Sequence, residues 1–191
     1  MQTLKDELRH RILVEAEHLF LQFGYDRTSM QTIADKVNIS KSNLYHYFKS
    51  KEELFYELTD TAAAGLKRII LRYKDRRFDP VTGVREYQIL LSEEMIQLMM
   101  DEHYGLLLIM EQADGTRYEG LRASMIQMFA VKTAPMLASE ENCDLLAQIM
   151  ARNLIDGMVL ILKNRVRLRD IRHNLNLLVE YHTKGINALL R

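Results

Sequence analysis

The chain has 191 residues, its 26 Lys and Arg residues are balanced by 26 Asp and Glu residues, and 48% of its residues are hydrophobic. This length suits one or two compact domains with a sizeable core, and only eight Gly and two Pro residues favour long helices with few turns. A net charge of zero excludes a protein that is basic over its whole surface, so any DNA affinity has to come from a local patch and to fall as salt rises.

The sequence also indicates the compartment. The single cysteine, Cys143, excludes a disulfide within the chain and fits a reducing environment. No apolar run approaches the ~20 residues of a membrane helix, and the first residues lack the pattern of a signal peptide. We therefore expect a cytoplasmic protein.

The first predicted helix runs from about Leu4 to Phe23, and Gly24 follows as a residue that ends it. Apolar side chains recur along this helix every three or four residues and predict one buried face. The stripe consists of Leu8, Ile12, Ala16, Leu19, Phe20 and Phe23.

The next stretch packs three helix starts into fewer than thirty residues. Thr28 with Gln31 fits a capping box, in which the side chain of each residue accepts a hydrogen bond from the backbone amide of the other. Ser40 can cap a second helix. Ser50 with Glu53 makes another capping box and starts a third helix.

The middle one of these helices is too short to be stable alone, so its neighbours must hold it. Leu44 and Phe48 share one face and are expected to point inward. Asn38 tolerates the left-handed backbone that the preceding tight turn requires. The remaining face is polar, aromatic and basic, as in a helix-turn-helix that presents a recognition helix to DNA. It carries Lys41, Ser42, Asn43, Tyr45, His46 and Tyr47.

DNA chemistry assigns roles to these side chains. Lys41 and Ser42 lie at the start of the helix, where an inserted helix meets base edges. Hydroxyl groups and Lys side chains suit phosphates. The positive charge of Lys51 lies in the first turn of the following helix, where it opposes the helix dipole. A nearby phosphate would explain a Lys at this position. An ordinary aromatic patch in a helical protein remains the alternative interpretation.

The residue order in this region resembles the DNA-binding domain of the TetR family of bacterial repressors. The similarity covers roughly residues 8 to 58. It implies an all-helical homodimer that binds a palindromic DNA operator and releases it when a small molecule binds. The residues that carry it are Gly24-Tyr25, Thr28-Ser29-Met30, Ile33-Ala34, Val37-Asn38-Ile39-Ser40-Lys41, Leu44-Tyr45-His46-Tyr47-Phe48 and Lys51-Glu52-Glu53-Leu54.

By position, the resemblance places Lys41 and Ser42 at bases. Asn38 and Ser42 depart from the family pattern, since Gly is common at both positions, and the Ser42 side chain could alter the sequence that is read. The residues that the resemblance places at or near phosphates are Thr28, Ser40, Asn43, Tyr45, His46, Tyr47 and Lys51.

The helix that starts at Lys51 is predicted to continue past Gly65 to about Tyr73. The predicted domains are therefore a helix-turn-helix DNA-binding domain over residues 1–50 and a helical effector-binding and dimerisation domain over residues 51–191. This helix connects the two, so a tilt at its far end would move the recognition helix.

The rest of the chain predicts further helices. A charged loop spans 74–80, a short apolar helix spans Leu106–Ala113, another helix starts near Thr116, and Pro135 kinks or ends it. Two long helices follow, over Glu141–Lys163 and Leu168–Leu190. One apolar stripe precedes them at Val84, Tyr87, Leu91, Met95 and Leu98, and another lies at Leu121, Met125, Met128 and Phe129.

The last helix has an apolar seam at alternating spacings of four and three, which suits packing on another helix pair. The seam consists of Ile171, Leu175, Leu178, His182, Gly185 and Leu189. The resemblance implies that the last two helices form a four-helix bundle with their partner copies; the alternative is that both belong to the core of one chain. The predicted dimer interface consists of Leu154, Gly157, Met158, Ile161, Leu175, Leu178, His182 and Gly185.

The resemblance also implies an effector pocket, and the 11 Met residues suit an adaptable apolar lining. We expect a small, mostly apolar effector with one or two polar groups. The candidate lining residues are His103, Tyr104, Met110, Glu111, Met125, Met128, Phe129 and Asn153.

Other function classes have weaker support. None of the six His residues has a metal-ligand spacing, and no nucleophile or phosphate-loop motif occurs. We predict no enzyme, no metal and no cofactor. The alternatives are a helical small-molecule-binding protein that does not bind DNA, and a small helical enzyme in which Glu102, His103 and Glu111 would have to form an acid–base site.

Overall fold

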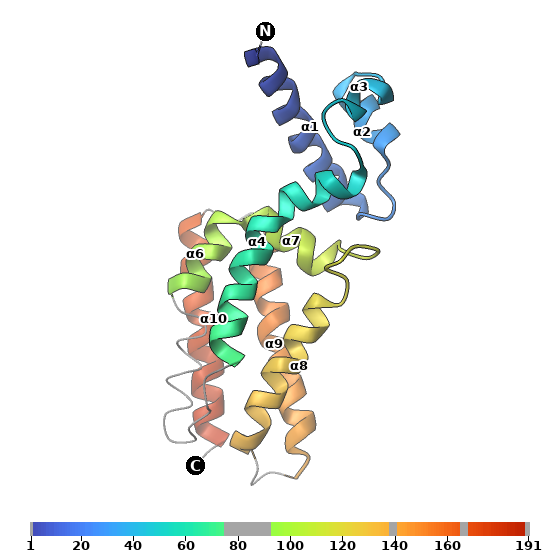
Figure 1. Cartoon of the computed structure of the whole chain (residues 1–191). Coiled ribbons are helices and arrows are strands. Elements are labelled where there is room, and N and C mark those ends of the chain that lie inside the picture. The colour runs from blue at the N-terminus through green and yellow to red at the C-terminus, as the bar shows by residue number, and fades with distance from the viewer. Residues whose placement is uncertain (1, 75–92, 138–140, 165–167, 190–191) are drawn as a thin grey trace. The chain divides into compact units, whose positions relative to one another are not determined.

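The computed structural model describes residues 2–74, 93–137, 141–164 and 168–189, and all regular structure in these ranges is helical (Figure 1). The predicted all-α fold is confirmed. The predicted loop after residue 74 and the stripe positions Val84, Tyr87 and Leu91 lie outside the described residues, as does Leu190.

The observed helices follow the sequence predictions closely, with most ends within two residues. In chain order they are α1 (Gln2–Phe23), α2 (Met30–Val37), α3 (Lys41–Tyr45), α4 (Lys51–Lys74), α6 (Glu93–Asp101), α7 (His103–Glu111), α8 (Leu121–Thr133), the short 3-10 helix η1 (Ala134–Leu137), α9 (Cys143–Lys163) and α10 (Leu168–Leu189).

The predicted helix start near Thr116 is wrong, because the chain forms turns until α8 begins at Leu121. Gly115 and Gly120 have φ angles of +79° and +75°, which a right-handed helix cannot contain. The Thr116 hydroxyl donates to the Ala113 carbonyl at 2.7 Å and so stabilises a turn rather than a helix start. Pro135 lies in η1, where α8 has ended as predicted.

Contacts divide the chain into two compact units. The first unit contains the residues up to Ala63 together with Tyr104–Gly120, and the second contains Ala64–His103 and the residues from Leu121 onward. The first unit is therefore larger than the predicted DNA-binding domain over residues 1–50, since it also contains half of α4 and most of α7. The predicted division of function between two domains remains a proposal.

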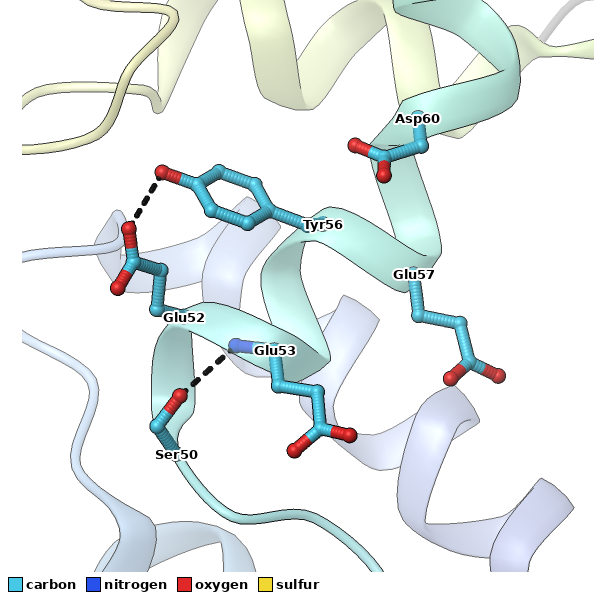
Figure 2. A pocket seen from close by; sticks show the side chains of 6 residues that line it. All are labelled: Ser50, Glu52, Glu53, Tyr56, Glu57 and Asp60. Carbon is cyan, nitrogen blue, oxygen red and sulfur yellow. Dashed lines mark hydrogen bonds between the residues drawn. The ribbon is translucent and has the colours of Figure 1, made fainter.

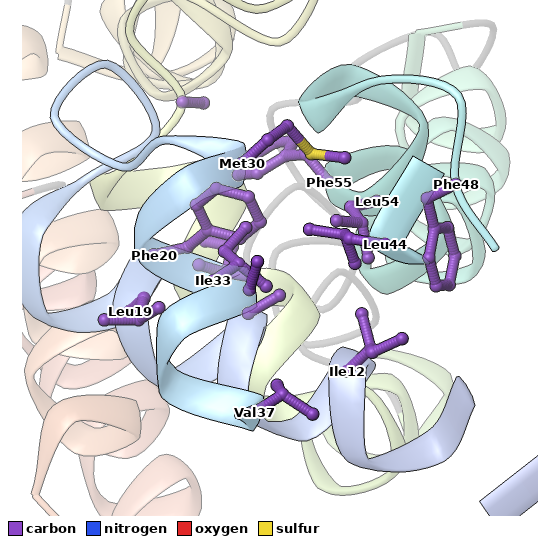
Figure 3. Packing of buried hydrophobic residues seen from close by; sticks show 14 residues of the cluster. Ile12, Leu19, Phe20, Met30, Ile33, Val37, Leu44, Phe48, Leu54 and Phe55 are labelled. Atoms are coloured by element: carbon purple, nitrogen blue, oxygen red, sulfur yellow. The ribbon is translucent and has the colours of Figure 1, made fainter. Parts of the chain in front are cut away.

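The core of the first unit is formed where α1, α2, α3 and α4 meet (Figure 3). Phe20 from α1 and Phe55 from α4 are fully buried, and their rings meet edge to face with centroids 5.3 Å apart. Ile33 from α2 lies in the same cluster. The predicted stripe of α1 ends one turn early: Phe23 is 48% exposed, because the core closes over Leu19 and Phe20.

The second unit is built on α8, α9 and α10, with α9 packed against both of the others. Leu154 from α9 and Leu175 from α10 are fully buried. A Cβ on Gly157 would lie 2.9 Å from a methyl carbon of Leu178, so the glycine allows α10 to approach α9 closely. Arg122 of α8 donates to Asp156 of α9 at 2.8 Å.

Among the described residues, α9 is the one helix with the length and mean hydropathy of a membrane span, 1.6 over 18 residues. Its packing against α8 and α10 and its ion pair through Asp156 are features of a core helix in a globular domain. Length and apolar composition alone are therefore weak grounds for a membrane helix here.

The turn between α2 and α3 depends on Asn38, which has φ +60° and ψ +46°. The Ile39 amide donates to the Ala34 carbonyl at 3.0 Å, so the turn also satisfies the end of α2. Asn tolerates this left-handed backbone better than residues with other side chains, and Gly tolerates it best.

Asn38→Ala should lower the free energy of unfolding by about 1 kcal/mol, because Ala is strained at this backbone conformation. Asn38→Gly is the matched control and should retain or slightly raise stability. Urea unfolding of both variants measures the difference. Equal stability of the two variants would contradict the role assigned to the left-handed turn.

Candidate nucleic-acid interface

The shortest helix, α3, has five residues and is capped at its start by Ser40. The Ser40 hydroxyl accepts the Asn43 amide at 3.1 Å, and the Ser40 carbonyl accepts the Leu44 amide at 3.0 Å. The predicted cap at Ser40 is therefore confirmed.

Two fully buried side chains hold α3: Leu44 within the helix and Phe48 three residues after its end. Leu44 packs in the core of the first unit with α1, α2 and α4 (Figure 3). The Arg9 guanidinium lies 5.0 Å from the centroid of the Phe48 ring and covers it. These contacts hold a helix that could not persist alone.

The predicted base and phosphate contacts of α3 therefore point outward or lie at its edge. Lys41 and Ser42 are exposed at its start, and the hydroxyls of Ser42 and Ser40 lie 3.0 Å apart. Since Ser40 is fixed by its capping bond, this contact also orients Ser42. Exposed side chains are Ser40, Lys41, Ser42, Tyr45 and His46, whereas Asn43 and Tyr47 are half-buried.

The cap predicted at Thr28 is wrong, because Ser29 caps α2 instead. The Ser29 hydroxyl accepts the Thr32 amide at 3.0 Å. Thr28 is only 3% exposed, and its hydroxyl donates to the Gly24 carbonyl at 2.8 Å. A hydroxyl buried in this way is poorly placed for a phosphate. Sequence reasoning missed exposed Ser29 and Thr32, although Ser is a preferred capping residue and directly follows Thr28.

Lys51 has a partner inside the first unit. Its Nζ donates to the Tyr25 carbonyl at 2.7 Å and lies 4.0 Å from the centroid of the Tyr25 ring. Burial lowers the pKa of Lys51. These contacts explain why a Lys at the start of α4 is tolerated, without a phosphate. Its predicted phosphate contact remains a proposal.

The start of α4 is fixed by the predicted capping box. The Ser50 hydroxyl accepts the Glu53 amide at 3.0 Å, and the Glu53 carboxylate accepts the Lys49 amide at 2.5 Å. The carboxylate reaches one residue further back than in the usual box.

An acidic groove runs along α4 in the first unit, and its carboxylates have partners (Figure 2). The Tyr56 hydroxyl donates to Glu52 at 2.7 Å. Glu57 pairs with Arg9, and Asp60 pairs with Arg117. Although Arg9 and Arg117 balance part of this charge, a lining rich in carboxylates makes the groove a poor site for phosphate. Its lining residues are Ser50, Glu52, Glu53, Tyr56, Glu57 and Asp60.

The residues predicted to line an effector pocket belong to both compact units. In the first unit, Tyr104 is exposed, whereas Met110 and Glu111 are half-buried. The other five residues lie in the second unit: Met125 and Phe129 are buried, His103 and Met128 are half-buried, and Asn153 is exposed. Burial lowers the pKa of His103. The effector site remains a proposal.

Half of the residues predicted for a dimer interface are already buried within the single chain. Leu154 and Leu175 are fully buried, Met158 is 7% exposed and His182 is 4% exposed. Such side chains have almost no surface left for a partner, and the seam of α10 packs on its own chain. Gly157, Ile161 and Leu178 are half-buried, and Gly185 is exposed.

Comparison with known proteins identifies the family. Residues 12–58 match the sequence family described as bacterial regulatory proteins, tetR family. The chain is 42% identical over 57 residues to the uncharacterized HTH-type transcriptional regulator YhgD of Bacillus subtilis, a match that covers 30% of each protein. It is 26% identical over 172 residues to the HTH-type transcriptional regulator AcrR of Shigella flexneri, which covers 80% of this chain and 77% of AcrR.

The fold of a solved structure agrees with these matches. The TetR family transcriptional regulator PfmR from Thermus thermophilus aligns with a TM-score of 0.53 at 21% identity, over 95% of this chain and 94% of PfmR. The matched residues 12–58 contain the turn at Asn38, the capped α3 and the buried pair that holds it. Residues 12–58 therefore match the tetR family of bacterial regulatory proteins in sequence, and the fold of the whole chain agrees with that of a TetR family regulator.

Proposed function

We propose that the protein is a ligand-responsive transcriptional regulator that binds a palindromic DNA operator as a homodimer and acts as a repressor. A small-molecule effector held by the helical second unit releases the operator, and the protein works in the cytoplasm. The proposal includes no enzymatic activity, no metal and no cofactor.

The observation that carries the proposal is the outward face of α3. Its first residues, Lys41 and Ser42, are exposed on a helix whose opposite face is fully buried. This is the position from which an inserted helix contacts base edges in the major groove. Tyr45 is 44% exposed, and it offers a hydroxyl to a phosphate oxygen at the edge of the groove.

The charges of the first unit support an approach of DNA through α3. Lys41 and Lys49 are exposed on either side of its aromatic residues. The carboxylates of the acidic groove, including Glu52 and Asp60, lie on α4 and repel phosphate. The molecule has no net charge, so this local difference has to orient it on DNA.

Dimerisation is proposed through α9 and α10, on faces other than the buried seam. Each helix has exposed apolar side chains that recur at helical spacing, and a partner chain would cover them. An isologous pairing of these faces would place each helix pair against its copy. The exposed side chains are Leu145, Ile149 and Leu160 on α9, and Leu177 and Tyr181 on α10, with exposed fractions from 46% to 68%.

A dimer explains operator recognition and release together. Two α3 helices enter successive major grooves when they lie about 34–36 Å apart, one turn of DNA. The effector favours a state in which that spacing no longer fits. It can shift the equilibrium only by the difference between its affinities for the two states.

Substitution of Lys41 and Ser42 tests base recognition. Lys41→Ala should reduce discrimination against wrong base pairs by about 1–3 kcal/mol, and Ser42→Gly should change the preferred sequence without loss of folding. Lys67→Ala, an exposed Lys on the second half of α4, is the control. Selection of bound duplexes from a random pool at physiological salt measures both effects. A sequence profile identical to that of the unchanged protein would remove both residues from base recognition.

Lys51→Met separates a structural role of Lys51 from a role in DNA binding. Loss of the donor to the Tyr25 carbonyl should lower the free energy of unfolding by about 1–2 kcal/mol. If Lys51 also contacts a phosphate, the salt dependence of log Kobs should decrease in slope by about 0.9. Lys67→Met controls for general loss of charge. An unchanged slope, with reduced stability, would assign Lys51 to Tyr25 alone.

Charges on the exposed faces of α9 and α10 should produce monomers. Leu160→Glu with Leu177→Glu places two buried charges in the proposed interface and should leave each chain folded. Val131→Glu on α8, at a side chain that is 60% exposed, is the control. Sedimentation measures the oligomeric state. A dimer that persists in the double variant would point to another interface.

A further inference from the structure

Two adjacent side chains on α10 are buried without hydrogen-bond partners. His182 is 4% exposed and Thr183 is 5% exposed. Within the part of the chain that the structure describes, His182 Nε2 and Thr183 Oγ1 are the buried side-chain polar atoms that lack any partner. Natural proteins keep few such atoms, and each one calls for a physical explanation.

The hydroxyl of Thr183 differs from those of Thr59 and Thr133, two other threonines that are buried within helices. Thr59 donates to the carbonyl of Phe55 at 2.7 Å, and Thr133 donates to the carbonyl of Phe129 at 2.9 Å. Both therefore use the carbonyl one turn earlier in their own helix. Thr183 has no such bond, although the same type of carbonyl lies one turn before it. Its hydroxyl remains available to a molecule from outside the chain.

A partner chain is poorly placed to satisfy this pair. Leu177 and Tyr181 mark the exposed face of α10, with exposed fractions of 50% and 68%. His182 lies on the same stripe as the fully buried Leu175, two turns earlier, and faces the interior of the second unit. The burial of His182 therefore favours a role inside the unit, and its place in a dimer interface stays a prediction.

The chemistry of the pair selects the group that would bind it. Burial alone lowers the pKa of His182, with no charged neighbour contributing, so the imidazole is neutral at neutral pH. A neutral Nε2 either donates or accepts, and a Thr hydroxyl does both. An uncharged hydroxyl or carbonyl group matches these atoms. Among the described residues no carboxylate contributes to the pKa of His182, so a buried ammonium group would lack a counter-charge there.

The buried surface of the second unit suits the rest of such a molecule. Methionine side chains are flexible and polarisable, so they can rearrange around an apolar ligand at low cost. Five are buried in this unit: Met95, Met99, Met125, Met136 and Met158.

We propose that His182 Nε2 and Thr183 Oγ1 form the polar anchor of the effector site and bind an uncharged hydroxyl or carbonyl group of an otherwise apolar small molecule. The inference rests on the proposed function, in which the second unit holds the effector. It adds the residues that orient the effector and the chemical class of the group that they bind.

The test uses 1-octanol, 2-octanone and octylammonium chloride as probes of equal chain length. Octanol and octanone should raise the unfolding midpoint of the full-length protein, whereas octylammonium should bind at least about tenfold more weakly. Octanol should also shift the ring resonance of His182 in carbon–proton NMR spectra, with the resonance assigned by its loss in His182→Phe. The resonance of exposed His173 should not move and serves as the internal control.

The double variant His182→Phe with Thr183→Val keeps the shape of both side chains and removes their polar atoms. Its unfolding midpoint should equal or exceed that of the unchanged protein, because no buried polar atom is left unpaired. Its affinity for octanol should fall about tenfold. His173→Phe should leave the affinity unchanged. If the double variant does not fold, two other measurements test the proposal. They are the shift of the His182 resonance in the unchanged protein and the octanol affinity of the two single variants.

Three results would overturn the proposal: an unchanged octanol affinity in the double variant, a His182 resonance that does not move at saturating octanol, or no octanol binding to the unchanged protein. Operator binding, measured by fluorescence anisotropy in the same samples, distinguishes this failure from failure of the proposed function. If the protein binds the operator but octanol does not affect His182, only the proposed polar anchor is wrong. If octanol affects His182 but the protein does not bind DNA, the proposed regulatory function is wrong and the proposed ligand site stands.

Discussion

The burial of Leu44 and Phe48 is the interaction on which the DNA-binding surface depends. A helix of five residues is far below the length at which helices are stable alone, about 12–15 residues. The burial of this pair in the first unit therefore replaces the missing helical stability. The cap at Ser40 fixes where α3 begins, and the turn at Asn38 fixes its direction. The exposed positions Lys41, Ser42 and His46 can be polar because buried residues hold the helix.

The same unit contains the segment Tyr104–Gly120, whose two ends continue along the chain into residues of the second unit. Within the first unit, the Gln112 carbonyl accepts the amide of Tyr25 at 3.2 Å, and Lys51 binds the carbonyl of that same residue. The Arg117 guanidinium lies 3.7 Å from the centroid of the Tyr56 ring. A displacement of this segment would therefore act on both the turn before α2 and the start of α4. For the proposed effector in the second unit, this segment is a covalent connection through which binding would bias the placement of α3.

The sequence was sufficient where local chemistry decides the structure. Helical periodicity predicted the burial of Leu44 and Phe48, and the spacing of Ser50 and Glu53 predicted the start of α4. It failed where neighbouring residues compete for one role. Thr28 and Ser29 both carry a hydroxyl suited to cap α2, and only the burial of Thr28 gives the role to Ser29. The partner of Lys51 could not be predicted, because Tyr25 is distant in sequence and binds through its backbone.

The two apolar faces of α10 show a further limit of sequence patterns. Spacings of four and three predict that a face is buried, but they do not indicate whether the same chain or a second copy buries it. The regular seam through Leu175 packs on its own chain, and the less regular face through Leu177 and Tyr181 is left exposed. His182 belongs to the seam by spacing, yet it is polar and has no partner there. A seam built only for packing would carry an apolar side chain at this position, since burying an unpaired imidazole opposes folding. A bound molecule, as proposed for this site, would supply the hydrogen bond that the chain does not.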